Sequence, residues 1–213
     1  MGTDRLIQRL ADLEREWRLQ GAPVAEKAAP GLTDAQIDVL MAPVGIDLPD
    51  ELRAWWRWHN GLVEDGTDYG FGPTFDFGSV GPGAWQLISL EEAIDRYQCE
   101  SRSAQWPGDP IAGEFYWRDS WFPFAAASQD VLFLDTAEAT SDVCAPVRFR
   151  ASENWRYWDV PQAPSLADGV GMWVRALREG YFVWDPDAGE QGEWVHHRVR
   201  PLPLNLRNPL ITG

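Results

Sequence analysis

The sequence predicts an α+β fold, in which a mostly antiparallel sheet packs with several short helices in a single domain. Segments with helical periodicity and capping signals alternate with short apolar or aromatic segments typical of strands. The spacings between these strand candidates are too short for many parallel crossovers. One candidate, Val131 to Leu134, is fully apolar, as a central strand would be.

The chain begins with a predicted helix over Asp4 to Gln20. Its apolar stripe consists of Leu6, Leu10, Leu13 and Trp17. Residues 21–30 are small and form a predicted linker, so we expect the first helix to be an appended element. The predicted division is an N-terminal helix and linker over 1–31, the α+β domain over 32–200, and an extended C-terminal tail over 201–213.

A second helix is predicted from the capping box formed by Thr33 and Gln36, and it must end before Pro43. Ile37, Leu40 and Met41 are expected to face inward.

A third helix is predicted over Leu48 to Leu62, and we expect much of the chain to pack against it. Pro49 suits the first turn, and Asn60-Gly61 is the predicted end of the helix. The face expected to be buried consists of Leu52, Trp55, Trp56 and His59.

Strands dominate the remaining prediction, with helices between them. A helix follows Ser89, with Glu92 completing a capping box, and another runs from Ser165 to Gly180. Strands are expected at 74–77, 84–88, 121–124, 131–134, 147–150 and 156–160, and a closing hairpin at 181–184 and 193–199.

Charge gives the clearest compositional signal. The chain has 33 acidic and 18 basic residues, a net charge of −15. This balance disfavours nucleic acid and anionic membranes as partners and favours a basic protein. Acidity that serves solubility alone is the alternative.

Cellular location is predicted from hydropathy. No apolar run reaches the length of a membrane-spanning helix, about 18 residues, and the N-terminal segment is charged throughout. We therefore expect a cytoplasmic location.

No arrangement of residues predicts catalysis, a metal or a cofactor. His59 is expected to have a packing role, and His196 and His197 are neighbours on a predicted strand that point to opposite faces. Cys99 and Cys144 lack metal-type spacing and are expected to be plain buried or half-buried thiols. An unrecognised enzyme and a sugar-binding module rich in tryptophan remain alternatives.

The run from Leu32 to Leu62, LTDAQIDVLMAPVGIDLPDELRAWWRWHNGL, resembles the N-terminal signature of the SUKH superfamily. These are the bacterial and fungal proteins related to the Smi/Knr cell-wall assembly regulators. The segments SLEEAIDRY, WFPFAAASQDVLFLD, VRFRASENWRYWDV and SLADGVGMWVRAL follow in the order of the family. Ser128-Gln129-Asp130 replaces the usual glycine turn, and the resemblance extends to about Gly180.

The resemblance implies a small α+β fold without known catalytic activity, whose role is to bind another protein. Many bacterial members are immunity proteins that block a toxin domain, often a nuclease. A nuclease has a basic surface for phosphates, so the acidity of this chain agrees with such a partner. The alternative is a cytoplasmic regulatory or scaffold module of the Smi/Knr type, whose partner is not a toxin.

Four residues are the candidate partner-binding set. Trp58 lies away from the predicted buried face of its helix and is the candidate aromatic anchor. The alternative for Trp58 is burial beneath the loop over 64–83. Glu64, Asp65 and Asp68 are the candidate charged contacts to a basic partner. The sequence predicts no oligomeric state.

Overall fold

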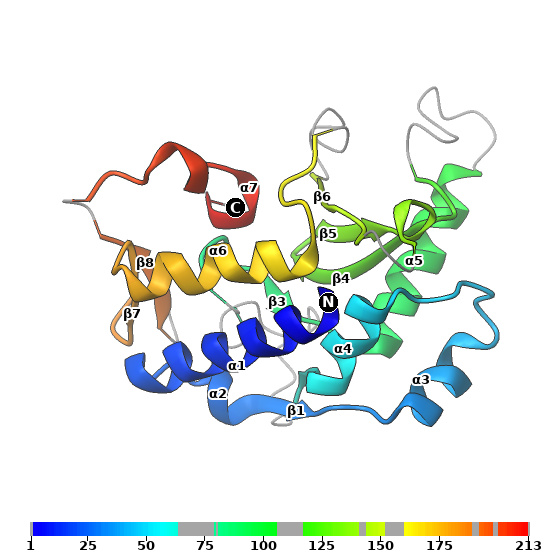
Figure 1. Cartoon of the computed structure of the whole chain (residues 1–213), viewed down its shortest axis with the longest axis horizontal. Coiled ribbons are helices and arrows are strands. Elements are labelled where there is room, and N and C mark those ends of the chain that lie inside the picture. The colour runs from blue at the N-terminus through cyan, green and yellow to red at the C-terminus, as the bar shows by residue number, and fades with distance from the viewer. Residues whose placement is uncertain are drawn as a thin grey trace.

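The centre of the molecule is an antiparallel sheet of four strands in the order β3-β4-β5-β6 (Figure 1). The computed structural model describes residues 2–63, 79, 81–105, 117–140, 144–151, 160–188, 192–197 and 200–212. The strands are β3 (Gln86–Leu87), β4 (Trp121–Ala127), β5 (Asp130–Asp135) and β6 (Val147–Arg150). β5 pairs with β4 and β6 and is buried from Val131 to Asp135, which confirms the predicted central strand.

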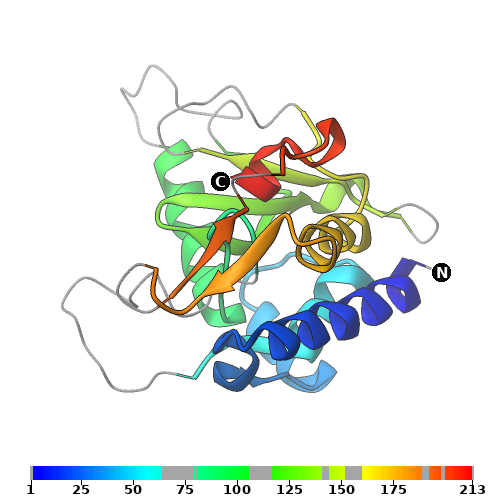
Figure 2. The same cartoon turned by 90° about the vertical axis from the view of Figure 1, so that its left-hand side faces the viewer.

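One face of β4 is covered by helices α4 (Asp50–Trp58) and α5 (Leu90–Ala104). Trp56 of α4 meets Phe122 edge-on at a centroid distance of 5.8 Å, and Tyr97 of α5 lies 5.6 Å from the same ring. Trp121 alternates to the opposite face, where it stacks on Phe133 at 4.6 Å. Sheet and helices therefore form the two layers of an α+β fold, as predicted (Figure 2).

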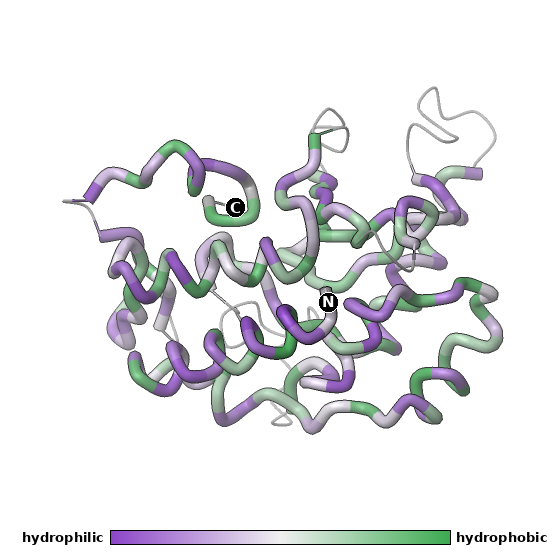
Figure 3. The backbone as a smooth tube through the Cα atoms, viewed as in Figure 1, coloured by the Kyte–Doolittle hydropathy of each residue, from purple (hydrophilic) through white to green (hydrophobic). Residues whose placement is uncertain are grey.

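Helix α1 (Gly2–Gln20) lies alongside α6 (Leu166–Arg178) (Figure 1). Polar and apolar residues alternate along α1 (Figure 3). Its predicted stripe is buried in the main core, and it consists of Leu6, Leu10, Leu13 and Trp17. At the rim of this contact Arg178 Nε donates to Glu16 at 2.9 Å. The helix expected to be appended thus packs into the same core as the sheet.

The predicted linker contains two short elements, α2 (Val24–Lys27) and β1 (Ala28–Pro30). β1 pairs antiparallel with β2 (His59–Leu62), and the Val63 N–H donates to the Lys27 carbonyl at 2.8 Å. The prediction of a helix reaching Leu62 is therefore wrong, because α4 ends at Trp58 and the chain extends to pair with β1.

Asn60 and Gly61 position α5 instead of ending α4. Asn60 Oδ1 accepts the Leu90 N–H at 2.7 Å, and its Nδ2 donates to Glu91 at 3.2 Å. Gly61 has φ 76°, and a Cβ there would lie 2.7 Å from the Ser89 nitrogen. Only glycine permits this close approach of β2 to α5.

Side-chain caps begin the helices largely as predicted. Thr33 and Gln36 form the full capping box of α3 (Asp34–Met41). At α5 the Ser89 hydroxyl accepts the Glu92 N–H at 3.1 Å, but the Glu92 carboxylate pairs with Arg96. The predicted capping box of α5 is therefore only half formed.

The C-terminal part contains the predicted hairpin, β7 (Phe182–Asp185) and β8 (Glu193–His196). The tail differs from the extended segment expected, because it forms the turns η2 (Leu204–Leu206) and α7 (Pro209–Thr212). Trp173 Nε1 donates to the Leu210 carbonyl at 2.8 Å. The turn η1 (Thr136–Glu138) follows β5. The predicted strand at 74–77 lies outside the described residues, as does the predicted strand at 156–160 apart from its last residue, Val160.

The burial of α1 generates a stability prediction. Leu13→Ala, at a side chain with 0% exposure, is expected to lower the free energy of unfolding by about 2–5 kcal/mol through lost burial and a cavity. Leu19→Ala on the same helix, where the side chain is 72% exposed, is the matched control and should change it by less than about 0.5 kcal/mol. Urea denaturation followed by circular dichroism measures both, and equal small effects would mean that α1 does not contribute to the core.

Candidate protein-binding site

Trp58 is the last residue of α4 and lies half-buried against α1. Its ring centroid is 5.2 Å from that of Trp17 and 5.5 Å from that of Trp55. Its Nε1 donates to Glu14 at 3.3 Å. These contacts with α1 and α4 fix the orientation of an indole that remains partly open to solvent.

His59 follows Trp58 and supports it. The two ring centroids are 4.5 Å apart, and His59 Nδ1 donates to the Ala29 carbonyl at 2.9 Å. The imidazole therefore has a packing role, as predicted, although it belongs to β2 instead of α4.

The candidate charged residues Glu64, Asp65 and Asp68 lie outside the described residues. The chain enters their segment directly after Val63, which is tied to Lys27 through the backbone. Their cooperation with Trp58 stays a prediction.

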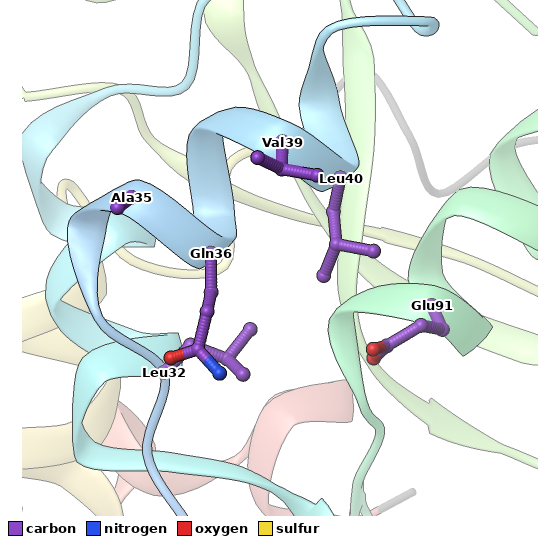
Figure 4. A pocket seen from close by; sticks show the side chains of 6 residues that line it. All are labelled: Leu32, Ala35, Gln36, Val39, Leu40 and Glu91. Carbon is purple, nitrogen blue, oxygen red and sulfur yellow. The ribbon is translucent and has the colours of Figure 1, made fainter.

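The structure also contains a surface groove that sequence reasoning missed, between α3 and the start of α5 (Figure 4). Its volume is about 420 Å³ and its lining consists of Leu32, Ala35, Gln36, Val39, Leu40 and Glu91. Ile37 and Met41 turn toward the core, so the opposite side of α3 faces the groove. The available signal was Val39, an apolar residue outside the predicted inward stripe. Leu40, expected inward, is half-buried and lines the groove.

Charges near the groove divide into neutralised and unneutralised groups. On α3, Asp38 accepts from Arg53 at 2.7 Å and Asp34 from Arg57 at 3.3 Å. The α4 arginines thus neutralise the acidic side of α3. Glu91 on α5 is exposed and forms no ion pair with another described residue.

Many arginine side chains elsewhere also pair with the protein's own carboxylates. Ion pairs of this kind are Arg15–Asp12, Arg96–Glu92, Arg148–Glu138, Arg150–Glu100, Arg175–Glu179 and Arg178–Glu16. The exposed acidic side chains that form no ion pair within the described ranges are Glu26, Asp47, Asp50, Glu91, Asp95, Asp119, Asp187 and Glu193. A partner approaching the described surface therefore meets surplus negative charge.

The buried carboxylate of Glu51 lies beside the thiol of Cys144. Glu51 accepts the N–H groups of Leu166 at 3.2 Å and Ala167 at 3.3 Å, at the start of α6. Burial raises the pKa of Glu51 despite these donors. Burial and the neighbouring Glu51 raise the pKa of the Cys144 thiol, which keeps it protonated and unreactive. Glu51 is thus a structural cap.

The other cysteine, Cys99, is exposed, so the expectation of a buried or half-buried thiol is wrong there. Among the described residues, no three histidine, cysteine or acidic side chains are grouped so that they could hold a metal ion. No helix in the described ranges combines the length and apolar character needed to cross a membrane.

Comparison with models of protein families identifies the family of this chain. The model of the SMI1/KNR4 family (SUKH-1) matches residues 31–167, which is more than half of the chain. The matched region runs from just before α3 into the first turn of α6. A search of curated proteins found no match.

The raised pKa of Glu51 predicts a pH dependence of stability. The unfolded chain loses the Glu51 proton near the ordinary value of 4.5, before the folded protein does, so rising pH favours the unfolded state. Wild-type stability should therefore fall relative to Glu51→Gln as pH rises from 4.5 through the higher folded pKa. Urea denaturation at a series of pH values measures the difference.

Glu193→Gln, at an exposed carboxylate without an ion pair within the described ranges, is the control for loss of one negative charge. A difference between wild type and Glu51→Gln that is independent of pH would contradict the assignment of Glu51 as a buried, desolvated carboxylate.

Proposed function

The chain belongs to the SMI1/KNR4 family (SUKH-1), and on this basis we propose that it is an immunity protein that binds and neutralises a basic toxin domain. SUKH domains are commonly immunity proteins and are generally not catalytic. The observation that carries the proposal beyond the family is the net charge of −15. A nuclease toxin, with its basic surface for phosphates, fits this charge best.

The surplus negative charge of the protein supports the proposal because it would accelerate association with a basic toxin domain. Because many of the arginines are occupied by carboxylates of the chain itself, the surplus negative charge on the described surface is available to a partner. Opposite fields on two proteins accelerate their encounter, and added salt screens this effect. Rapid capture suits an inhibitor that must stop a toxin before it acts.

The proposed contact residues are Trp58 as an aromatic anchor and Glu64, Asp65 and Asp68 as charged contacts. Trp17 and Glu14 hold the Trp58 ring in place. An anchor that is already oriented loses little conformational entropy on binding. The cytoplasmic location expected from the sequence belongs to this proposal.

Affinity capture from the producing cells tests the function directly. The tagged protein is used as bait at low salt, and mass spectrometry identifies the captured proteins. Recovery of one basic toxin domain whose toxicity the protein suppresses is the expected outcome. Recovery of cell-envelope or signalling enzymes would replace the proposal with the regulatory or scaffold module of the Smi/Knr type.

Salt dependence tests the electrostatic part. The association rate constant with the captured toxin domain should fall by about tenfold between low and high salt, because salt screens the attraction. Stopped-flow tryptophan fluorescence measures the rate. A rate that is the same at both salt concentrations would contradict electrostatic capture.

Site variants test the contact residues. The variant E64Q/D65N/D68N should slow association more than D119N/D187N/E193Q, which removes the same charge from exposed acidic side chains elsewhere. Trp58→Phe keeps an aromatic ring against Trp17 and should accelerate dissociation. If the two triple variants slowed association equally, Glu64, Asp65 and Asp68 would not be specific contacts to the partner.

A further inference from the structure

The groove between α3 and α5 has an apolar floor that the described elements do not cover. Leu32, Val39 and Leu40 provide this floor, and the Val39 side chain is 73% exposed. Its volume of about 420 Å³ lies within the usual range of ligand pockets, about 300–1,000 Å³. An apolar group that covered Val39 and the rest of this floor would remove apolar surface from water and so lower the free energy.

Two polar groups face the groove above this floor. The Glu91 carboxylate points from α5 toward the space beside Leu40 (Figure 4). Asn60 Nδ2 donates to this carboxylate at 3.2 Å, which orients it without neutralising it. The Oε1 of Gln36 is occupied by Thr33, so its Nε2 remains as a donor toward the groove (Figure 4).

We propose that this groove binds an arginine side chain on a basic segment of the protein partner. The methylene stem lies on Leu32, Val39 and Leu40, and the guanidinium pairs with Glu91. Gln36 Nε2 donates to a backbone carbonyl of the same segment. This inference rests on the proposed function and specifies which surface recognises the partner.

Charge complementarity with Glu91 favours an arginine side chain as the ligand of the groove. A purely apolar side chain would leave Glu91 covered and without a cation, which costs free energy. Arginine combines an apolar stem with a planar cation that can bind a carboxylate through two parallel hydrogen bonds. Its guanidinium is also less strongly hydrated than the lysine ammonium, which favours transfer to a partly apolar groove.

Titration with a small probe tests the groove without knowledge of the partner. Acetyl-leucyl-arginine amide is added to the full-length protein, and backbone amide shifts are followed by NMR. Saturable shifts at Gln36, Val39, Leu40 and Glu91 are expected. The citrulline peptide, an uncharged isostere, should bind about two- to fivefold more weakly, as for loss of a partly exposed ion pair.

Two variants and two matched controls assign the interaction. Glu91→Gln and Val39→Ser should each weaken arginine-peptide binding severalfold. Glu193→Gln and Leu204→Ser change an exposed carboxylate and an 83% exposed leucine elsewhere and should leave binding unchanged. Thermal denaturation checks that all four variants are folded.

Three results would overturn the groove assignment. These are absence of saturable shifts up to the solubility limit of the peptide, equal binding of the citrulline peptide, and equal shifts at other exposed acidic residues such as Asp119.

The captured toxin domain separates this inference from the proposed function. A toxin that binds wild type and Glu91→Gln with equal affinity would contradict the assignment of the groove as an arginine site, but it would still support the immunity function. Arginine-peptide binding at the groove without any captured toxin would support the groove and count against the immunity function.

Discussion

The aromatic packing around Trp55 is the interaction on which the rest of the fold depends. Its ring centroid lies 5.4 Å from Phe124 of the sheet, 6.4 Å from Trp173 of α6 and 5.5 Å from Trp58. Trp58 in turn contacts Trp17 of α1. Trp55 and Trp58 of α4 together connect the sheet with α6 and α1. Because large aromatic side chains contribute heavily to core stability, this packing fixes where α4 lies.

The position of α4 determines the surface that we assign to partner binding. Its end at Trp58 directs the chain into β2, and Asn60 of β2 then bonds to the first residues of α5. Glu91 is held beside the groove as a result. On the other side, Arg53 of α4 neutralises Asp38 of α3. The same short helix therefore neutralises a carboxylate of α3 and leaves the Glu91 carboxylate of α5 available to a partner.

Much of the fold could be predicted because its signals are local. The Thr33 capping box, the fully apolar β5 and the stripe on α1 are each specified within a few residues, and each is present. Local signals also gave the correct family, because its signature lies in the continuous run from Leu32 to Leu62.

Errors arose where distant residues decide the structure. Asn60-Gly61 resembles a helix end, but pairing with β1 stops α4 at Trp58 and frees Asn60 to bind α5. The groove needs α3 and α5 side by side, and no periodicity along one segment reveals that contact. Of the predicted site, Trp58 alone lies within the described residues, and its contacts with α1 join residues far apart in sequence.

The backbone bond between Lys27 and Val63 has a practical consequence for chemical labelling. Lys27 is the only lysine in the chain, so amine-reactive reagents have one side-chain target besides the terminal amine. The backbone carbonyl of Lys27 accepts a hydrogen bond from the N–H of Val63, the residue immediately before the acidic segment that begins at Glu64. A fluorophore attached at Lys27 would therefore report on the approach of a partner to that segment.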